Sequence, residues 1–233
     1  MINKNSTGDE VVAEFERTLT EVAQQTMHAK NFSVKQTMAL AQRALSRITE
    51  KMEEHVYNQT MERIAGGDIP APDAWEWRLA DNTGWTLAHY AAMRGLLPEG
   101  FTRWDLANNQ GYSVAYTAAQ NNCLPEDFQN WEWASHGGRT VAHESVKFRK
   151  LPLDAHQWSI ATKGGWTVAH EAAGYNNLPE DFNQWEMADE EGTTVAQIAA
   201  IHGNLPGDFD RWDLVSEKFR PVGQKKASPK MGL

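Results

Sequence analysis

Apolar and polar positions between residues 75 and 212 recur with a fixed period of twenty-seven positions, the step from Trp77 to Trp104. Tryptophan marks the period at Trp77, Trp104, Trp131, Trp158, Trp185 and Trp212, and Leu-Pro pairs mark it at Leu97, Leu124, Leu151, Leu178 and Leu205. Glycine does the same at Gly84, Gly111, Gly138, Gly165 and Gly192. A unit this short cannot bury its apolar face alone, so the repeat predicts stacked units that share one core.

Each unit begins with the signals of a tight turn and a helix. The stretch Asp81–Gly84 and its equivalents place Asp, Asn, Ser or Thr first and glycine fourth, which is typical of a type I turn. The next Thr or Ser, such as Thr86, is a good helix N-cap. Small residues follow, Ala88, Ala91 and Ala92 in the first unit, and they line one helix face and allow close packing.

The Leu-Pro segment predicts a second helix in each unit. Proline suits the first turn of a helix, where its missing N–H leaves no bond unmade. In the second unit Glu126 and Asp127 would lie near the positive end of that helix. Phe128 and Trp131, three residues apart, would face the core together. The predicted unit is therefore helix, loop, helix and turn.

The first seventy residues lack the repeat and predict two helices. Apolar residues with helical spacing predict the first helix over residues 9–29. Ser33 and Gln36 form a capping-box pattern that opens the second, and Gly66-Gly67 ends it. Val34, Met38, Ala41, Leu45, Ile48 and Met52 follow a heptad along the second helix. Either this helical hairpin caps the end of the repeat stack, or Met38, Leu45, Ile48 and Met52 mediate self-association.

The segment G-x-T-V-A-H-x-A-A, from Gly165 to Ala173, resembles the ankyrin repeat motif G-x-T-P-L-H-x-A-A. The resemblance covers residues 75–212, but the unit is shorter than that of ankyrin, which has about 33 residues. It also lacks the hairpin segment of ankyrin, so a plain turn is expected. The expected fold is all-α: an α-solenoid of about five helix-loop-helix ankyrin-like repeats with an N-terminal helical hairpin cap. The expected divisions are 1–70, 71–215 and a disordered basic tail over 216–233.

Charge and composition narrow the function classes. The net charge of −9 divides into −2 for residues 1–70, −10 for 71–212 and +3 for 213–233. An acidic repeat region disfavours nucleic-acid binding, which depends on lysine and arginine neutralising phosphates. The sequence shows no signal peptide and no membrane-spanning stretch, and one cysteine forms no internal disulfide, so a cytoplasmic protein, or one delivered into a host cytosol, is expected.

Candidate chemistry has structural explanations. His89, His143 and His170 share one repeat column, yet helices stacked about 8–10 Å apart place them too far from each other to share a zinc ion. In ankyrin repeats the matching histidine hydrogen-bonds neighbouring backbone, and the resemblance implies that role here. No nucleophile-elbow, Walker A, dinucleotide-binding or H-E-x-x-H motif occurs. A non-enzymatic protein without cofactor or metal is expected.

The varied columns predict where a partner binds. The ankyrin resemblance implies that recognition uses the two positions before the turn glycine, the position after it and the two positions after Ala-Ala. The expected partner-binding residues are Trp85, Tyr112, Arg139, Trp166, Arg94, Phe148 and Tyr175. Trp, Tyr and Arg are enriched in interface hot spots. The alternative is that Trp85, Tyr112 and Trp166 stack on each other as a structural ladder.

The function expected is therefore a protein-protein interaction scaffold that binds a partner through the concave face of the solenoid. Among such scaffolds, a bacterial or phage effector or inhibitor that masks a host protein is the kind that we expect. The alternative is an acidic decoy that inhibits a nucleic-acid-binding protein. A decoy would bind with a steep salt dependence, whereas an aromatic interface tolerates salt.

Overall fold

The computed structural model describes residues 8–28, 33–148 and 155–220, and the chain divides into two compact units, Met1–Asn109 and Gln110–Leu233. The division falls inside the repeat region, between Asn109 and Gln110. Unit 1 contains α1 (Gly8–His28), α2 (Val34–Ala65), η1 (Trp75–Arg78) and α3 (Leu87–Arg94). Unit 2 contains α4 (Val114–Gln120), α5 (Val141–Ser145), η2 (Val146–Phe148), α6 (Ala155–Trp158), α7 (Val168–Gly174), α8 (Val195–His202), η3 (Trp212–Leu214) and η4 (Glu217–Phe219).

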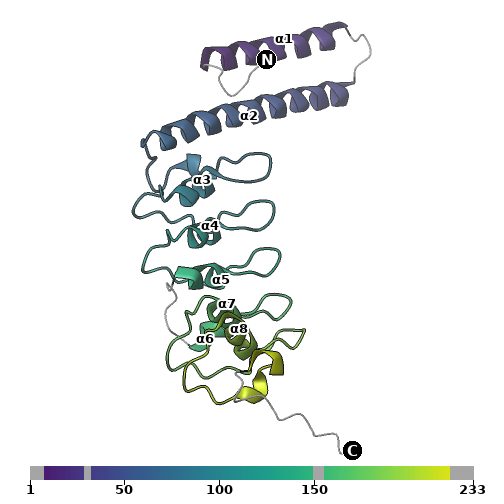
Figure 1. The fold of residues 1–233 in the computed structure, drawn as a ribbon. Helices are drawn as coiled ribbons and strands as arrows, with labels where there is room; N and C mark the ends of the chain where they lie inside the picture. The colour runs from purple at the N-terminus through teal and green to yellow at the C-terminus, as the bar shows by residue number, and fades with distance from the viewer. Residues whose placement is uncertain (1–7, 29–32, 149–154, 221–233) are drawn as a thin grey trace, which may run out of the picture. The chain divides into compact units, whose positions relative to one another are not determined.

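The two N-terminal helices of unit 1 form a hairpin, as the sequence predicts (Figure 1). The capping box of Ser33 and Gln36 opens α2, whose last residue, Ala65, is followed by Gly66 as C-cap. Ion pairing between Lys51 of α2 and the carboxylate of Glu14 of α1, at 3.0 Å, joins the helices. Further along, α2 contacts η1 and α3.

The heptad along α2 is divided between two environments. Ile48 is buried, whereas Met38, Leu45 and Met52 are exposed. The buried part faces the rest of unit 1, and the exposed part is a stripe that no described residue covers.

The repeated turn has the geometry that the sequence predicts. In four of the units the N–H of the fourth residue, Gly84, Gly138, Gly165 or Gly192, donates to the carbonyl oxygen of the first at 2.9–3.0 Å. These four glycines have φ between +77° and +82°. A single antiparallel bridge closes each turn, for example Ala80 to Thr86. The ankyrin hairpin is thus reduced to a turn with one bridge.

Glycine in the turn also allows the next repeat to approach. A Cβ atom on Gly138 would lie 2.8 Å from the backbone nitrogen of Lys163, in the following turn. At Gly192, in the last repeat, nothing lies within 4 Å of such a Cβ atom. At Gly138 two features therefore require glycine: the positive φ and the close approach of the next backbone. At Gly192 only the positive φ requires it.

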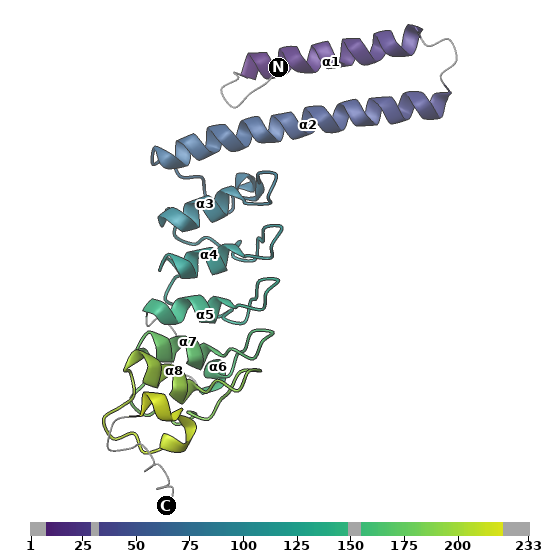
Figure 2. The same cartoon turned by 45° about the vertical axis from the view of Figure 1, so that its right-hand side comes forward.

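The helix after each turn begins where predicted. The hydroxyls of Thr86, Ser113, Thr167 and Thr194 accept the backbone N–H three residues later. The inward side chains are small and fully buried: Ala88, Ala91, Ala115, Ala118, Ala142, Ala169, Ala172, Ala196 and Ala199. In unit 2 the helices stack side by side, α4 on α5 and α7 on α8 (Figure 2).

The predicted second helix is wrong for four of the five repeats, and each repeat is built on one main helix. In the segment after Leu124, the N–H of Phe128 donates to the carbonyl of Pro125, and the N–H of Trp133 donates to that of Asn130, both at 3.3 Å. These bonds close two successive tight turns. Among the described residues only the third repeat has an α-helical turn here, α6; residues 149–154 of its Leu-Pro segment lie outside the described residues.

The short period explains the missing helix. Within one period the chain must form a two-turn helix, the turn with its bridge, and two reversals, so little length remains for another helix. Short helices need tertiary packing to be stable. Here Phe and Trp provide that packing to the turns instead: Phe128 and Trp131 meet edge to face at 5.2 Å, and Phe182 and Trp185 at 5.0 Å.

The C-terminal end of unit 2 closes with its own cluster. Ala196, Phe209 and Val215 are buried together, and Trp185, Trp212 and Phe219 pack against them. Phe219 belongs to η4, so the part of the predicted tail that the structure describes contains a short helix. The rest of that tail, 221–233, lies outside the described residues.

Candidate functional site

The histidine column is part of the scaffold. His170 is fully buried, and its Nδ1 accepts the N–H of Thr167 at 3.1 Å while its own backbone N–H donates to the Thr167 hydroxyl. Its Nε2 lies 2.9 Å from the carbonyl oxygen of Thr193, in the next repeat. Because Nδ1 accepts, Nε2 carries the proton and donates to that carbonyl. The histidine thus caps its own helix and bonds to the next turn.

Burial also fixes the protonation state of these rings. The same bonds hold His143, whose Nδ1 faces Thr140 and whose Nε2 lies 3.0 Å from the carbonyl oxygen of Trp166. Burial lowers the pKa of His143 and of His170 below the ordinary value. Both imidazoles are therefore neutral at pH 7. Among the described residues no group of three His, Cys, Asp or Glu could hold a metal ion.

The aromatic residues after the turn glycine lie over this column. The ring of Trp166 stacks on His170 at 5.0 Å. In the same way but more tilted, Trp85 lies over His89 and Tyr112 over Tyr116, both at 4.9 Å. All three outer rings are half-buried. Each ring is therefore paired within its own repeat, four residues away. One face of each outer ring contacts the buried residue of its pair, and part of the ring stays accessible to solvent.

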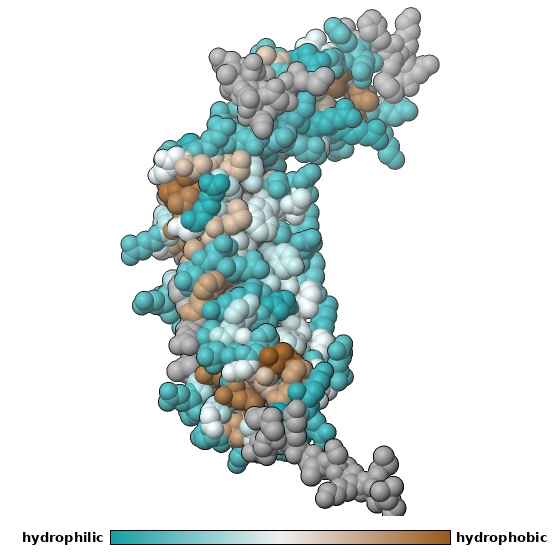
Figure 3. Space-filling model, in the orientation of Figure 1, coloured by the Kyte–Doolittle hydropathy of each residue, from teal (hydrophilic) through white to brown (hydrophobic). Residues whose placement is uncertain are grey.

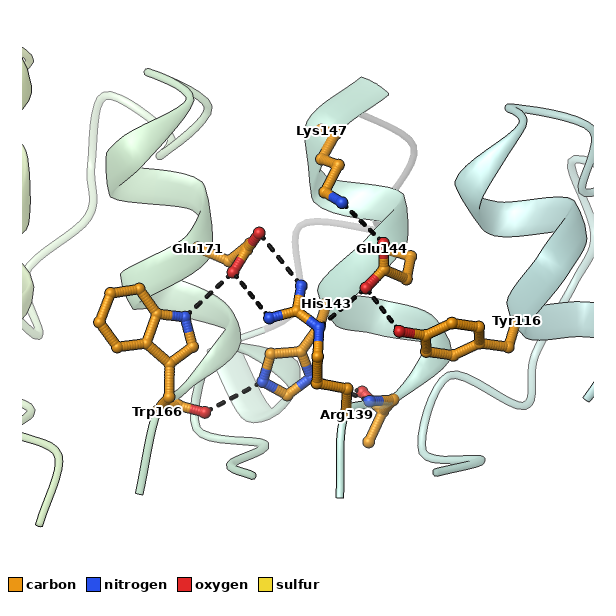
Figure 4. Close-up of polar contacts among 8 residues, drawn as sticks. Tyr116, Arg139, His143, Glu144, Lys147, Trp166 and Glu171 are labelled. Atoms are coloured by element: carbon orange, nitrogen blue, oxygen red, sulfur yellow. Dashed lines mark hydrogen bonds and ion pairs between the residues drawn. The ribbon is translucent and has the colours of Figure 1, made fainter. Parts of the chain in front are cut away.

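Arg139 takes the place of an aromatic ring in the third repeat and is the centre of a polar network. Its guanidinium lies 2.9 Å from the carboxylate of Glu144 and 3.2 Å from that of Glu171. Tyr116 donates its hydroxyl hydrogen to Glu144 at 2.8 Å. The network therefore joins α4, α5 and α7, the main helices of three successive repeats in unit 2 (Figure 4).

Two further donors complete the network. Lys147 lies 2.7 Å from Glu144, and the indole N–H of Trp166 donates to Glu171 at 3.0 Å. Glu144 is only 2% exposed, and two carboxylates face two cations, so the group carries no net charge. Burial alone would raise the pKa of Glu144, but hydrogen bonds from Lys147 and Tyr116 and the charge of Arg139 lower it. Glu144 therefore stays ionised at neutral pH.

The sequence reasoning missed Glu144, Glu171 and Lys147. Glu144 and Glu171 occupy the position after the histidine in neighbouring repeats, where the other repeats have Tyr90, Thr117 and Ile198. Two acids at this position in successive repeats, together with the single arginine in the column after the turn glycine, indicate an ion-pair network in the sequence itself. Their oxygens pair with Arg139 because successive helices lie in contact.

The remaining predicted residues lie at the C-terminal ends of the helices and are exposed. Phe148 is 42% exposed and Tyr175 is 50% exposed, and Ile201 of the last repeat is 47% exposed. They lie at or near the ends of η2, α7 and α8, where η2 contacts α7 and α7 contacts α8. In unit 1 the guanidinium of Arg94 lies 4.6 Å above the ring of Tyr90.

We call Phe148, Tyr175 and Ile201 the exposed apolar edge of unit 2. Lys147 lies 6.0 Å from the ring of Tyr175, so the edge adjoins the polar network. The face of the molecule in Figure 3 is mainly hydrophilic, with separate small apolar patches. Among the described residues no helix is both long and apolar enough to cross a bilayer.

Comparison with known proteins yields a structural likeness only. No protein-family model matches the chain, and no curated protein sequence matches it. Among solved structures the chain is similar to the ankyrin repeat domain of Bcl-3, described as a unique member of the IkappaB protein family. The identity is 15%, the TM-score is 0.41, and the match covers 64% of this chain and 77% of that one. The repeat is ankyrin-like in its turn, its capping threonine and its buried histidine, with one main helix in each copy.

Proposed function

We propose that the repeat array is a non-enzymatic scaffold that binds a partner protein through the helix ends and the aromatic column. The observation that carries this proposal is the position of the exposed apolar side chains. Met93, Phe148, Tyr175 and Ile201 are all at least 42% exposed, and all four belong to the two repeat columns after Ala-Ala. Within unit 2, the exposed apolar edge lies on a mainly polar surface, which is typical of an interaction site.

The network behind the edge supports a preorganised surface. Arg139, Glu144 and Trp166 are bonded to each other or to shared partners, so their side chains lose little freedom when a partner arrives. Because the network is neutral, a partner need not bring a compensating charge to this region. The expected interface is therefore apolar and aromatic at its centre and polar at its rim.

An experiment with exposed residues tests the proposal. The double variant Phe148→Ser/Tyr175→Ser should fold normally and lose the partner. Trp75→Ser is a matched control, because Trp75 is 56% exposed and lies outside the two columns. Affinity capture from cells that naturally express the chain, followed by measurement with the purified partner, should show binding by the wild type and by the control only. Equal binding by all three proteins would refute the proposal.

Salt separates this function from the acidic decoy. An interface centred on Tyr175 should keep its affinity when the salt concentration is raised, whereas a decoy would lose most of it. Repeating the binding measurement at about 50 mM and at about 500 mM salt distinguishes the two, since the Debye length falls several-fold over such a range.

A further inference from the structure

A second exposed apolar surface lies on α2. Met38, Leu45 and Met52 are 58%, 59% and 46% exposed. They are seven residues apart, which is close to two turns of helix, so they form one stripe along the helix. Three large exposed apolar side chains in a row on one helix are typical of a face that another helix covers.

The described residues of unit 1 do not cover this stripe. Ala44 and Ile48, on one side of it, are buried, and Lys51 is paired with Glu14 of α1 on that same side. Gln42 and Thr49, on the other side, are exposed along with the stripe. One flank of the stripe is therefore occupied by α1, while its centre and its other flank are open.

Charge is divided unequally along α2. Residues 34–48 contain three bases, Lys35, Arg43 and Arg47, and no acid. Residues 49–65 contain four acids, Glu50, Glu53, Glu54 and Glu62, against Lys51 and Arg63. The first half of the helix thus carries +3 and the second half −2. A helix with this polarity is complementary to a second copy of itself that runs in the opposite direction.

We propose that two copies of the chain pair through this stripe, with their α2 helices antiparallel and Leu45 at the centre. Met38 of one copy then lies level with Met52 of the other. The step from Lys35 to Glu53 is five full turns of an α-helix, so both lie on the same flank, where Glu53 also lines a hollow with Asp81. Pairing places Lys35 of each copy within reach of Glu53 of the other. Parallel pairing would instead bring residues of the same number, and hence like charges, to the same level.

The size of the stripe sets the strength of the pair. Three apolar side chains with their flanks cover less than the roughly 800 Å² per partner of a standard interface. The pair is therefore a weak, reversible dimer whose population rises with protein concentration. It also depends on salt, because Lys35 and Glu53 are exposed.

Sedimentation analysis of the full chain over a range of concentrations tests the pairing. Leu45→Glu places a charge at the centre of the stripe and should weaken the dimer by at least about tenfold. Arg43→Gln is the matched control: it changes the net charge by the same amount at an exposed position about 160° around the helix from Leu45 and should leave the dimer unchanged. A wild-type chain that stays monomeric at all concentrations, or equal dimerisation of both variants, overturns the proposal.

Charge reversal tests the antiparallel direction. Lys35→Glu and Glu53→Lys should each weaken the dimer several-fold at low salt, and the double variant should restore it. Within one chain these residues are about 27 Å apart along α2 and do not interact, so recovery can come only from contact between copies. Failure of the double variant to recover, with both single variants weakened, overturns antiparallel pairing.

Discussion

The Nε2 atom of His143 lies 3.0 Å from the carbonyl oxygen of Trp166, so one imidazole joins the third repeat to the turn of the fourth. His170 makes the same connection to Thr193. The residue type that first suggests a metal site is therefore a connector between repeats. Other polar contacts between repeats accompany it: the side-chain amide of Asn177 donates to the carbonyl of Val146 at 2.6 Å, and that of Asn204 donates to the carbonyl of Ala173 at 2.9 Å.

We expect His143→Ala to lower the free energy of unfolding by about 2–4 kcal/mol, because it removes a buried side chain and leaves the Trp166 carbonyl without its donor. His143→Gln should lose less, since Gln197 accepts the Thr194 N–H in the fifth repeat. Urea unfolding measures both. His202→Ala, at an exposed position, is the control and should cost little. Equal losses for the alanine and glutamine variants would contradict the capping role.

The same histidines predict how stability depends on pH. Burial lowers the pKa of His143 and His170 in the folded protein below the 6.5 expected when unfolded. Between these values the unfolded chain binds more protons, so folding is destabilised as the pH falls below 6.5. Each pH unit by which the folded pKa is lowered corresponds to about 1.4 kcal/mol.

Urea midpoints between about pH 7.5 and about pH 5.5 would measure this effect. Glu144 titrates outside that range, because its pKa is lowered from an ordinary value of 4.5. The double variant His143→Gln/His170→Gln should show a flatter pH profile than the wild type. An unchanged profile would mean that groups other than these two histidines cause the loss of stability at acidic pH.

Much of the fold could be predicted from the sequence because its signals are local. The turn glycines, the N-cap at Thr86 and the capping box at Ser33 each depend on neighbouring residues, and the structure confirms them. The second helix was mispredicted because Pro125 begins a tight turn as readily as a helix. The choice between turn and helix depends on how many residues the rest of the repeat leaves for this segment and on the packing of Phe128.

The candidate site was only partly predictable. Its columns could be read from the repeat, and the structure places Phe148 and Tyr175 at exposed helix ends. The bonds of Arg139 to Glu144 and Glu171 could not be derived, because they depend on the distance between successive helices. Whether the half-buried rings of Trp85 and Trp166 bind a partner remains a prediction.

We expect Glu144→Gln to destabilise the protein by about 2–3 kcal/mol, because the carboxylate is buried and its loss leaves Lys147 without this ion pair and Arg139 with Glu171 alone. The same carboxylate accepts the hydroxyl hydrogen of Tyr116. Partial exposure of both cations keeps the loss below that of a fully buried pair. Tyr116→Phe removes one hydrogen bond and should cost about 1 kcal/mol. Urea unfolding of both variants measures the difference, and a larger loss for Tyr116→Phe would contradict this ranking.

Stability measurements can separate the scaffold from the binding surface. Trp166→Ala removes the ring over His170 and the hydrogen bond to Glu171, so a loss of about 1–3 kcal/mol is expected. Phe148→Ser/Tyr175→Ser changes exposed side chains and should lower stability by less than about 1 kcal/mol. Thermal unfolding of both variants would check this. Loss of partner binding by the second variant at normal stability would assign the binding role to the helix ends.

The most direct test of partner binding is photo-cross-linking from the exposed apolar edge. A benzophenone amino acid replaces Tyr175 in one protein and Trp75 in another, because both aromatic side chains are about half exposed. After irradiation in cells that naturally express the chain, residue 175 should yield one discrete adduct with a partner protein, and residue 75 should not yield it. No adduct from residue 175, or the same adducts from both positions, would contradict a binding surface at the helix ends.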